Sequence, residues 1–290
     1  MVSRALALEP DQRGLVCLAD NLQVLPRIAA GSIDLVYIDP PFNTGKPQTR
    51  TRVRTRRAKA GEAGDRTGFG GHRYTTEKLS ETAYADRFGD YHAFLEPRLR
   101  EAHRVLAPHG SLYLHIDCRE SHYVKIMLDT IFGRDAFMNE IIWAYDYGGR
   151  PRDRWPAKHD TIFFYAKQPG KHVWNRDAID RIPYMAPGLV GEEKAARGKL
   201  PTDTWWHTIV SPTGKEKLGY PTQKPLGILR RIVTASSPPG GTVLDFFAGS
   251  GTAGAAALAE GRRFLLIDHH RPAYEVMQRR FANESGIVFE

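Results

Sequence analysis

The sequence predicts an α/β protein with a doubly wound, mostly parallel sheet of seven strands, one of them reversed. Short apolar segments rich in β-branched residues alternate with stretches whose apolar residues recur at helical spacing, the pattern of strand–helix–strand units. Two later apolar segments follow each other with no helix between them, which indicates an antiparallel pair. The predicted strands occupy residues 14–18, 33–38, 111–116, 139–145, 159–166, 243–247 and 263–267.

Length and composition suit one large domain with a small insertion, since the chain has 290 residues of which 41% are hydrophobic. No apolar run reaches the roughly 18 residues of a membrane span. The charged N-terminus lacks the apolar core of a signal peptide. Cys17 and Cys118 are expected to be reduced packing residues, and no Cys or His spacing fits zinc. We therefore expect a cytoplasmic protein without a metal.

The first elements are a strand at 14–18 and a helix at 21–29. Asp20 stands directly before that helix, where an aspartate side chain often accepts a hydrogen bond from a free backbone N–H. Asp20 is therefore expected either to cap this helix or to contact a ligand at the end of the preceding strand, and the sequence favours neither role.

The strand at 33–38 ends in Asp39-Pro40-Pro41-Phe42. Proline cannot continue a central strand, so the chain leaves the sheet at its carboxyl edge, where open α/β sheets bind ligands. A carboxylate there can accept a hydrogen bond from an amine, and an aromatic ring can stack on a flat heterocycle. Taken alone, the motif would also suit a plain strand end with a turn.

A basic segment begins four residues after Phe42. Residues 43–75 contain nearly all of the net charge of +8, and their composition shows no periodicity, so we expect a loop. A polyanion held over the preceding motif would explain the charge, and the alternative is a solvated loop. The residues expected to bind DNA in this loop are Lys46, Arg50, Arg52, Arg54, Arg56 and Arg57.

Helices are predicted at 91–106 and 121–132, on either side of the strand at 111–116. His115 in that strand is expected to be a packed residue rather than a catalyst. The strands at 139–145 and 159–166 are joined by a loop with glycines, aromatic residues and basic residues, including Arg150 and Arg152. Such a mixture is typical of contacts with bases and phosphates, although a surface hairpin loop is the plainer interpretation.

Residues 168–220 are rich in proline, glycine and charge and read as a small insertion. A helix at 226–235 follows Lys224, and a lysine near a helix start can hold a carboxylate.

The strand at 243–247 runs into a glycine-rich turn and a helix that begins near Thr252. Glycines let the backbone approach a ligand closely, and the helix N-terminus offers free N–H groups. The next strand, at 263–267, ends in Asp268, which is placed to accept both hydroxyls of a ribose. This half of the chain therefore predicts a nucleoside cofactor.

The two motifs together resemble the DNA amino-methyltransferases of the β class, which use S-adenosylmethionine. In that class, as here, Asp39-Pro40-Pro41-Phe42 precedes the turn Phe247-Ala248-Gly249-Ser250-Gly251. The resemblance implies a circularly permuted, Rossmann-like methyltransferase sheet and covers most of the chain. It implies cofactor contacts by Asp20, Lys224, Asp245, Phe247, Ala248, Gly249, Ser250, Gly251, Thr252 and Asp268, with Asp20 bonding the adenine amino group.

The same resemblance implies that Asp39 and the Pro40 carbonyl accept the hydrogens of an exocyclic amine, while Phe42 stacks on a flipped base. Asp at the first motif position favours adenine N6, and cytosine N4 is the alternative. Methylation at cytosine carbon 5 would need a cysteine nucleophile, typically after proline, and neither cysteine follows one. Phe42 replaces the more frequent tyrosine and keeps the stacking surface.

The resemblance divides the chain into a catalytic half at 1–167, a target-recognition insertion at 168–220 and a cofactor half at 221–290. It implies double-stranded DNA as the partner, and a homodimer and a cognate restriction endonuclease are further partners to consider.

Three other interpretations remain. Gly249, Gly251 and Gly254 formally satisfy G-x-G-x-x-G, so a nicotinamide oxidoreductase is one, although no catalytic domain follows the motif. A methyltransferase acting on RNA or protein is the second. A DNA-binding module without activity is the third, and the intact motif residues argue against it.

Overall fold

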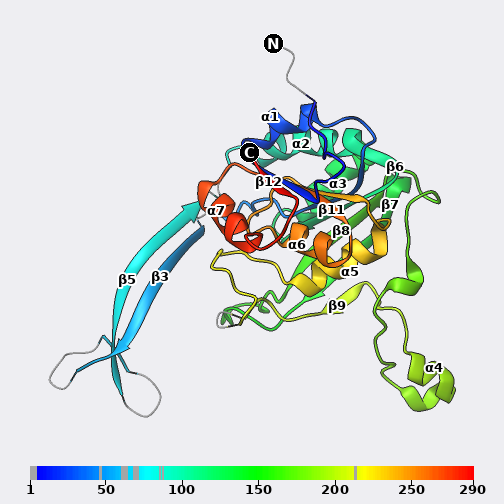
Figure 1. Ribbon diagram of the computed structural model, residues 1–290. Coiled ribbons are helices and arrows are strands. Elements are labelled where there is room, and N and C mark those ends of the chain that lie inside the picture. The colour runs from blue at the N-terminus through cyan, green and yellow to red at the C-terminus, as the bar shows by residue number, and fades with distance from the viewer. Residues whose placement is uncertain are drawn as a thin grey trace. The chain divides into compact units, whose positions relative to one another are not determined.

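The computed structural model describes residues 5–45, 48–59, 65–67, 72–84, 86, 88–211 and 214–290. Two compact units are present (Figure 1). The main unit comprises Met1–Asn43 and Phe88–Glu290, and the hairpin unit comprises Thr44–Arg87.

The main unit contains a sheet of nine strands in the order β12-β1-β11-β10-β2-β6-β8-β7-β9. All neighbouring pairs are parallel except those of β8, which runs antiparallel to both β6 and β7. The seven predicted strands and the single reversed strand are confirmed, and the short strands β12 and β9 extend the two edges. The bounds are β1 Gly14–Leu18, β2 Ile33–Ile38, β6 Leu106–Ile116, β7 Phe137–Ala144, β8 His159–Ala166, β9 Thr204–Trp206, β10 Thr242–Asp245, β11 Arg263–Asp268 and β12 Ile287–Phe289.

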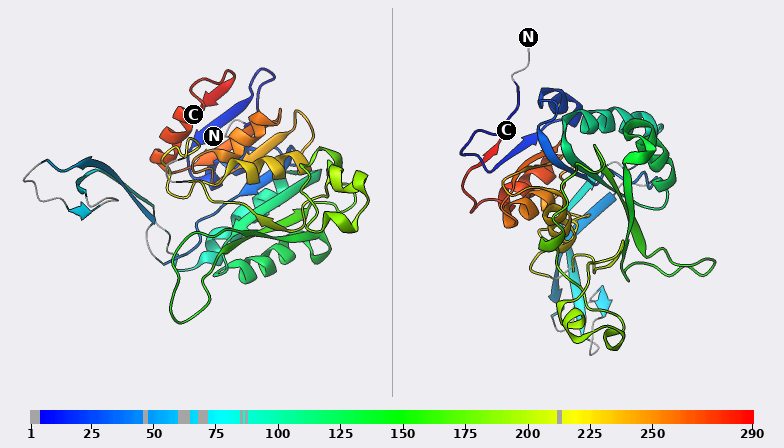
Figure 2. Two further views of the ribbon diagram at one scale, coloured as in Figure 1. Left: turned by 90° about the horizontal axis from the view of Figure 1, so that it is seen from below. Right: turned by 90° about the vertical axis from the view of Figure 1, so that its right-hand side faces the viewer.

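Helices cover both faces of this sheet, as Figure 2 shows. One apolar core lies between the sheet and α1, α2 and α3, and a second lies between the sheet and α5, α6 and α7. Alternate residues of β2 supply the two cores, with Val36 in the first and Leu35 in the second. The helices are α1 Asn21–Val24, α2 Tyr91–Val105, α3 Ser121–Phe132, α4 Glu192–Arg197, α5 Leu226–Ser236, α6 Thr252–Ala259 and α7 Arg271–Arg280, with 3₁₀ turns at Leu25–Arg27, Arg134–Ala136, Arg176–Ala178 and Pro187–Leu189.

The hairpin unit is a three-stranded antiparallel sheet in the order β3-β5-β4, with β3 at Gln48–Arg57, β4 at Arg66–Thr67 and β5 at Arg73–Tyr84. The prediction of a loop over 43–75 is therefore wrong. Arginine alternates with threonine and valine along β3, a period of two that fits a strand, but both faces are polar and no apolar alternation marks it. Lys46 lies outside the described residues.

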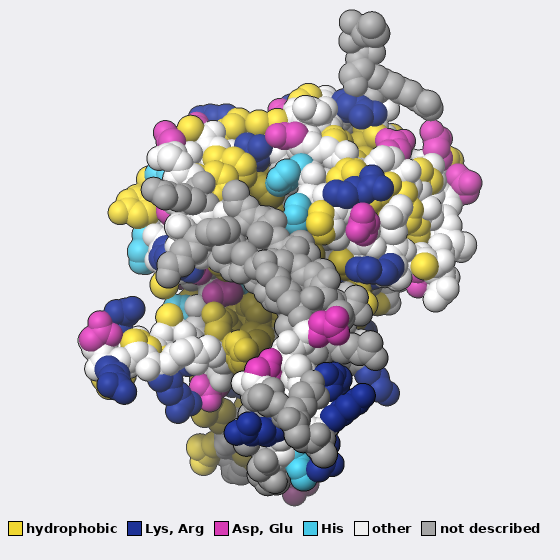
Figure 3. Space-filling model, turned by 90° about the vertical axis from the view of Figure 1, so that its left-hand side faces the viewer, with side chains coloured by type: hydrophobic (Ala, Val, Ile, Leu, Met, Phe, Trp, Pro, Cys, Tyr) yellow, Lys and Arg dark blue, Asp and Glu magenta, His cyan; other side chains and the backbone are white. Residues whose placement is uncertain are grey.

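Two other features of the sequence can be checked. Cys17 is buried as predicted, whereas Cys118 is exposed, because it follows the end of β6 instead of lying within a core strand. Among the helices that the structure describes, none combines the length and the apolar character that a bilayer span requires. On the face drawn in Figure 3, basic and acidic side chains are interspersed.

Candidate active site

The Asp39 motif and the glycine-rich turn leave neighbouring strands at the same edge of the sheet. β2 pairs in parallel with β10, with Leu35 opposite Val243 and Val36 opposite Leu244. The carboxyl ends of both strands therefore lie side by side, and the negative charge of Asp39 reaches the carboxyl group of Asp245 at the end of β10.

Asp39 forms an ion pair with Lys224, which precedes α5. The pair engages Asp39 Oδ2, while the buried Oδ1 has no hydrogen-bond partner among the described residues. A buried carboxylate oxygen without a partner carries a free-energy cost that a ligand N–H would remove. Lys224 Nζ also lies 5.0 Å from the centroid of the Phe42 ring, a cation–π contact. The Asp39 motif thus presents one hydrogen-bond acceptor without a partner among the described residues, Asp39 Oδ1, near the aromatic ring of Phe42.

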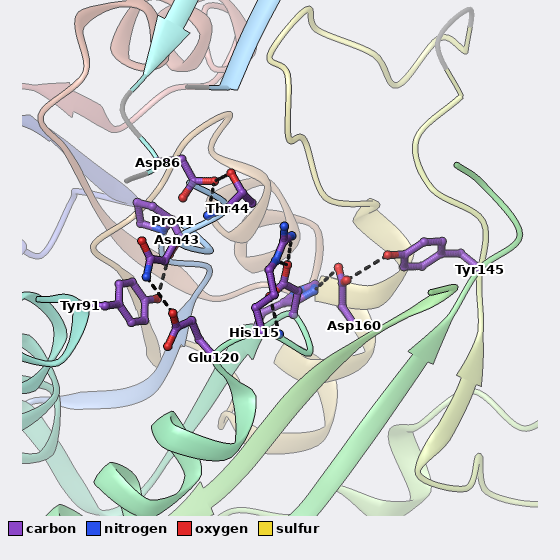
Figure 4. A network of polar contacts seen from close by, with 11 residues as sticks. Pro41, Asn43, Thr44, Asp86, Tyr91, His115, Glu120, Tyr145 and Asp160 are labelled. Atoms are coloured by element: carbon purple, nitrogen blue, oxygen red, sulfur yellow. Dashed lines mark hydrogen bonds and ion pairs between the residues drawn. The ribbon is translucent and has the colours of Figure 1, made fainter. Parts of the chain in front are cut away.

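Hydrogen bonds fix the backbone of the Asp39 motif (Figure 4). Tyr91 Oη donates to the Pro41 carbonyl over 2.8 Å. Asn43 adopts a left-handed conformation with φ of 54°, which asparagine tolerates better than most residues. Its Nδ2 donates to Glu120 Oε1 over 2.7 Å, and its Oδ1 accepts from the Phe88 N–H over 3.1 Å. These contacts come from α2 and from the start of α3, so the motif is held from several directions.

A mostly buried series of hydrogen-bonded side chains lies next to Phe42, and Figure 4 shows three of its members, His115, Asp160 and Tyr145. Tyr37 Oη and His115 Nδ1 are 3.0 Å apart, His115 Nε2 and Asp160 Oδ2 are 3.0 Å apart, and Tyr145 Oη donates to Asp160 Oδ1 over 2.9 Å. The His115 ring is 0% exposed and lies 5.9 Å from the Phe42 ring, between centroids. The prediction that His115 packs within its strand is correct.

The pKa shifts of Asp160 and Tyr37 indicate which of these side chains carry protons. Burial opposes ionisation of Asp160, but the hydrogen bond from His115 and the nearby positive charges hold the pKa of Asp160 below its ordinary value. Ionised Asp160 can only accept, so His115 Nε2 carries a proton and donates to it. Burial raises the pKa of Tyr37 well above its ordinary value, so its phenol keeps its proton and lies within hydrogen-bond distance of His115 Nδ1. Sequence analysis missed Asp160 and Tyr145; the available signal was an aspartate near the start of a strand whose later residues are mostly apolar.

The glycine-rich turn forms a close cradle. Gly249 and Gly251 have φ of 50° and 73°, in the left-handed region that glycine favours. A side chain at Gly249 would meet the Tyr220 ring at 3.1 Å, and one at Gly251 would meet Met277 Cγ at 2.8 Å. Asp268 Oδ2 accepts from the Gly249 N–H over 2.8 Å, so the acid at the end of β11 lies against the turn. The predicted grouping of the turn with Asp268 is present.

Further contacts hold the turn from outside. Arg280 Nε on α7 donates to the Ser250 carbonyl over 2.7 Å, and burial lowers the pKa of Arg280 to about 10. Ser250 Oγ lies 3.1 Å from Thr252 Oγ1 at the start of α6. Ala248 is buried and Phe247 is partly buried against the core of α1, α2 and α3. Sequence analysis missed Arg280 because nothing near it in sequence indicates the turn.

Asp245 is fully enclosed beneath the turn. Burial raises the pKa of Asp245 well above its ordinary value, while a hydrogen bond from the Phe247 N–H opposes the rise and the negative charge of Asp39 adds to it. The distance from the Phe247 N to Asp245 Oδ1 is 3.0 Å.

We expect Asp245→Asn to change how stability depends on pH. A carboxyl group whose folded pKa is raised holds its proton more tightly when folded, so the free energy of unfolding falls as the pH rises above about 4, the unfolded pKa. The carboxamide of the variant keeps an acceptor for the Phe247 N–H but does not titrate. Urea unfolding of the cofactor-free protein between pH 4 and 7 should show this decline in the native chain and a flatter profile in the variant. Parallel profiles would contradict the pKa shift of Asp245.

Asp20 caps α1, with its Oδ1 accepting from the Leu22 N–H over 2.8 Å. The same oxygen is 3.5 Å from Arg98 Nη2. The neighbouring Asn21 is buried and connects two strand ends, since its Nδ2 donates to the Phe246 carbonyl over 2.9 Å and its Oδ1 accepts from Arg98 Nε over 2.7 Å. The capping role expected of Asp20 is confirmed.

The loop between β7 and β8 lies at the same edge as Asp39, because β7 and β6 run in the same direction and β8 returns from that edge. Arg150 and Arg152 are exposed on it, and Arg150 Nη2 is 3.6 Å from Asp146 Oδ1. The side chain of Trp155 is 94% exposed on the same loop. In the part of the chain that the structure describes, no His, Cys, Asp and Glu side chains gather as a metal site would require.

Comparisons with known proteins agree with this geometry. The sequence profile of the DNA methylase family matches residues 33–279. The Type II methyltransferase M.HpaI of Haemophilus parainfluenzae is 30% identical over 94% of this chain and 75% of its own length. The DNA adenine methyltransferase YhdJ of Escherichia coli is 30% identical over 86% of this chain and 76% of its own. In the solved structures, M1.HpyAVI in complex with SAM shares the fold, with a TM-score of 0.57 at 19% identity over 92% of this chain and 98% of that one.

Proposed function

Because the chain belongs to the DNA methylase family, we propose that it transfers a methyl group from S-adenosylmethionine to N6 of adenine in DNA. The observation that carries the proposal is the buried Asp39 Oδ1 without a partner among the described residues, next to Phe42 and one strand from the glycine-rich turn. Two relatives at 30% identity support it by name: M.HpaI is a Type II methyltransferase, and YhdJ is a DNA adenine methyltransferase.

Asp39 activates the target amine by accepting one of its hydrogens at Oδ1. An exocyclic amine is a poor nucleophile because its lone pair is conjugated with the ring, and hydrogen bonds to Asp39 and the Pro40 carbonyl would localise that pair. Lys224 holds the other oxygen and so fixes the direction of the acceptor. Phe42 stacks on the base once it has left the duplex. Transfer would form the nitrogen–methyl bond as the sulfur–methyl bond breaks to leave a neutral thioether, and the extra proton would pass from the amine to Asp39 Oδ1.

The residues around the glycine-rich turn fit S-adenosylmethionine, which supplies the methyl group as a sulfonium. The left-handed Gly249 and Gly251 leave no room for side chains, so the backbone of the turn can approach a ligand closely. Asp268 at this turn would bind the ribose hydroxyls. Asp245, Phe247, Ala248, Ser250 and Thr252 would shape the cradle. Asp20 would bond the adenine amino group with the carboxylate oxygen that the cap leaves, and Lys224 would reach the methionine carboxylate.

Double-stranded DNA is the partner of a DNA methylase, and the exposed residues of the β7–β8 loop would contact it. Arg150 and Arg152 would bind phosphates, and Trp155 offers a stacking surface. Residues 168–220, which contain α4 and β9, lie in the chain between the catalytic half at 1–167 and the cofactor half at 221–290. They would recognise the target DNA sequence.

We also propose a homodimer. Tyr123 and Ile126 on α3 are 58% and 66% exposed and line a surface groove with His92 and Glu96 of α2, which gives two copies an apolar surface to share. Sedimentation of the purified chain checks this. A cognate restriction endonuclease and a cytoplasmic location are further proposals, based on the Type II name of M.HpaI and on DNA as the substrate.

The function is tested by identifying the modified base. Plasmid DNA lacking methylation is incubated with the protein and S-adenosylmethionine, digested to nucleosides and analysed by mass spectrometry. N6-methyldeoxyadenosine is the expected product. If N4-methyldeoxycytidine is found instead, the target base is cytosine and not adenine. Unmodified DNA with full cofactor binding would overturn the proposal.

A further inference from the structure

The arginines of β3 recur at every second residue. Successive residues of a strand lie on opposite faces of the sheet, so Arg50, Arg52, Arg54 and Arg56 share one face of the hairpin unit. We call these four residues the arginine face. The intervening positions on the other face are held by Thr49, Thr51, Val53, Thr55 and Arg57.

The pairing of β3 with β5 keeps this alternation unbroken. The register shifts between Arg52, opposite Ser80, and Val53, opposite Lys78, so the extra residue of the bulge is Leu79 on β5. β3 itself remains regular, and all four arginines stay on one side. The positions opposite them are Thr82, Ser80, Glu77 and Thr75, which include a single acid. The arginine face therefore carries a net positive charge, with Arg54 the only one of the four arginines that lies opposite an acid.

The spacing of this charge suits a nucleic-acid backbone. Alternate residues of a strand are about 6.8 Å apart. Phosphates of one DNA strand follow each other every 3.4 Å or so along the helix axis, and winding makes their direct separation larger, so the two spacings are of the same scale. A disordered segment with the same charges would present no particular face to DNA, whereas the paired strands β3 and β5 present the arginine face.

We infer that the arginine face binds consecutive phosphates of one DNA strand, and that the opposite face of the ribbon takes no part. This inference rests on the proposed function, because it takes DNA as the polyanion. It separates Arg56, on the arginine face, from its neighbour Arg57, which lies on the opposite face of the ribbon. The contacts would hold DNA without reading its sequence.

A face-swap variant tests the inference at constant composition. Exchanging Arg50 with Thr51 and Arg54 with Thr55 (R50T/T51R/R54T/T55R) moves two of four arginines to the other face and leaves the net charge unchanged. Binding to a fluorescein-labelled 30-base-pair duplex of random sequence is measured by anisotropy between about 50 and 200 mM NaCl. Each lost phosphate contact lowers the slope of log Kd against log salt by about 0.9, so a fall of about 2 is expected.

The single variants R56Q and R57Q are a matched pair that does not depend on the swap folding well. R56Q should lower the slope by about 1 and R57Q should leave it unchanged. Equal effects of the two, or an unaltered slope in a face-swap variant whose circular dichroism matches the native chain, would overturn the arginine face. If the native chain does not bind the duplex at all, the proposed function fails instead.

Discussion

Asp39→Ala abolishes methyl transfer while S-adenosylmethionine still binds with an affinity within about threefold of native. The variant removes the only side-chain oxygen proposed to touch the target amine, and losing such a contact typically costs on the order of 10³-fold in kcat. Cofactor binding survives because Asp39 is not among the residues proposed to hold the cofactor, and Lys224 keeps its charge for the methionine carboxylate. Transfer of tritiated methyl groups to DNA and calorimetric titration of the cofactor measure the two quantities.

Two control variants distinguish the role of Asp39 from that of Lys224. Asp39→Asn keeps the shape and one carbonyl acceptor but loses the charge, so residual activity above that of Asp39→Ala is expected. Lys224→Gln keeps Asp39 but no longer fixes it, and it should lower both turnover and cofactor affinity. Turnover of Asp39→Ala within about tenfold of native would remove Asp39 from the mechanism.

Asp160→Ala lowers the free energy of unfolding by about 3 kcal/mol, the scale of breaking a buried pair by removing one partner. The variant leaves the His115 Nε2–H without an acceptor inside the core and takes the partner of Tyr145 Oη away. Methyl transfer falls as well, because the His115 ring lies against Phe42 and Asp160 faces the charge of Lys224. Urea unfolding at pH 7 and initial rates of transfer are the measurements.

The acid limb of the stability curve gives an independent check. The folded pKa of Asp160 lies below its ordinary value, so its stabilising contribution is present above the unfolded pKa of about 4 and is lost as the pH falls through the folded pKa. Asp160→Asn, which keeps an acceptor but not the charge, should therefore lose less stability than the native chain below pH 4. Two results together would contradict this role of Asp160: stability that falls equally steeply below pH 4 in Asp160→Asn and the native chain, and a native free energy of unfolding in Asp160→Ala.

The strands of the main unit could be predicted because burial on both faces produces continuous apolar runs, as in residues 35–38, and proline marks the end of that run. The meeting of Asp39 with the glycine-rich turn was predictable too, since the carboxyl ends of parallel strands share an edge. In contrast, β3 of the hairpin unit alternates arginine with threonine and valine. Its sequence has a period of two but no alternation of apolar and polar residues, so the strand was not recognised.

The contacts within the site depend on tertiary structure that no local pattern encodes. Asp39 and Lys224 are 185 residues apart, and each can be interpreted separately as a ligand contact. Tyr37, His115 and Asp160 each resemble a packing residue of their own strand, and only the order of the strands brings them together. Capping by Asp20, in comparison, is a contact two residues away and was readable from the sequence.

The reversed strand β8 has a consequence for how this protein can diversify. The chain leaves β7 and enters β8 at one edge, so the segment between Tyr145 and Lys158 is closed by a single backbone hydrogen bond of 2.9 Å at its base. Substituting or lengthening this segment alters neither a crossover helix nor the register of the sheet. The loop could therefore be exchanged between related chains, which would change the DNA contacts proposed for it while the Asp39 motif and the glycine-rich turn are kept.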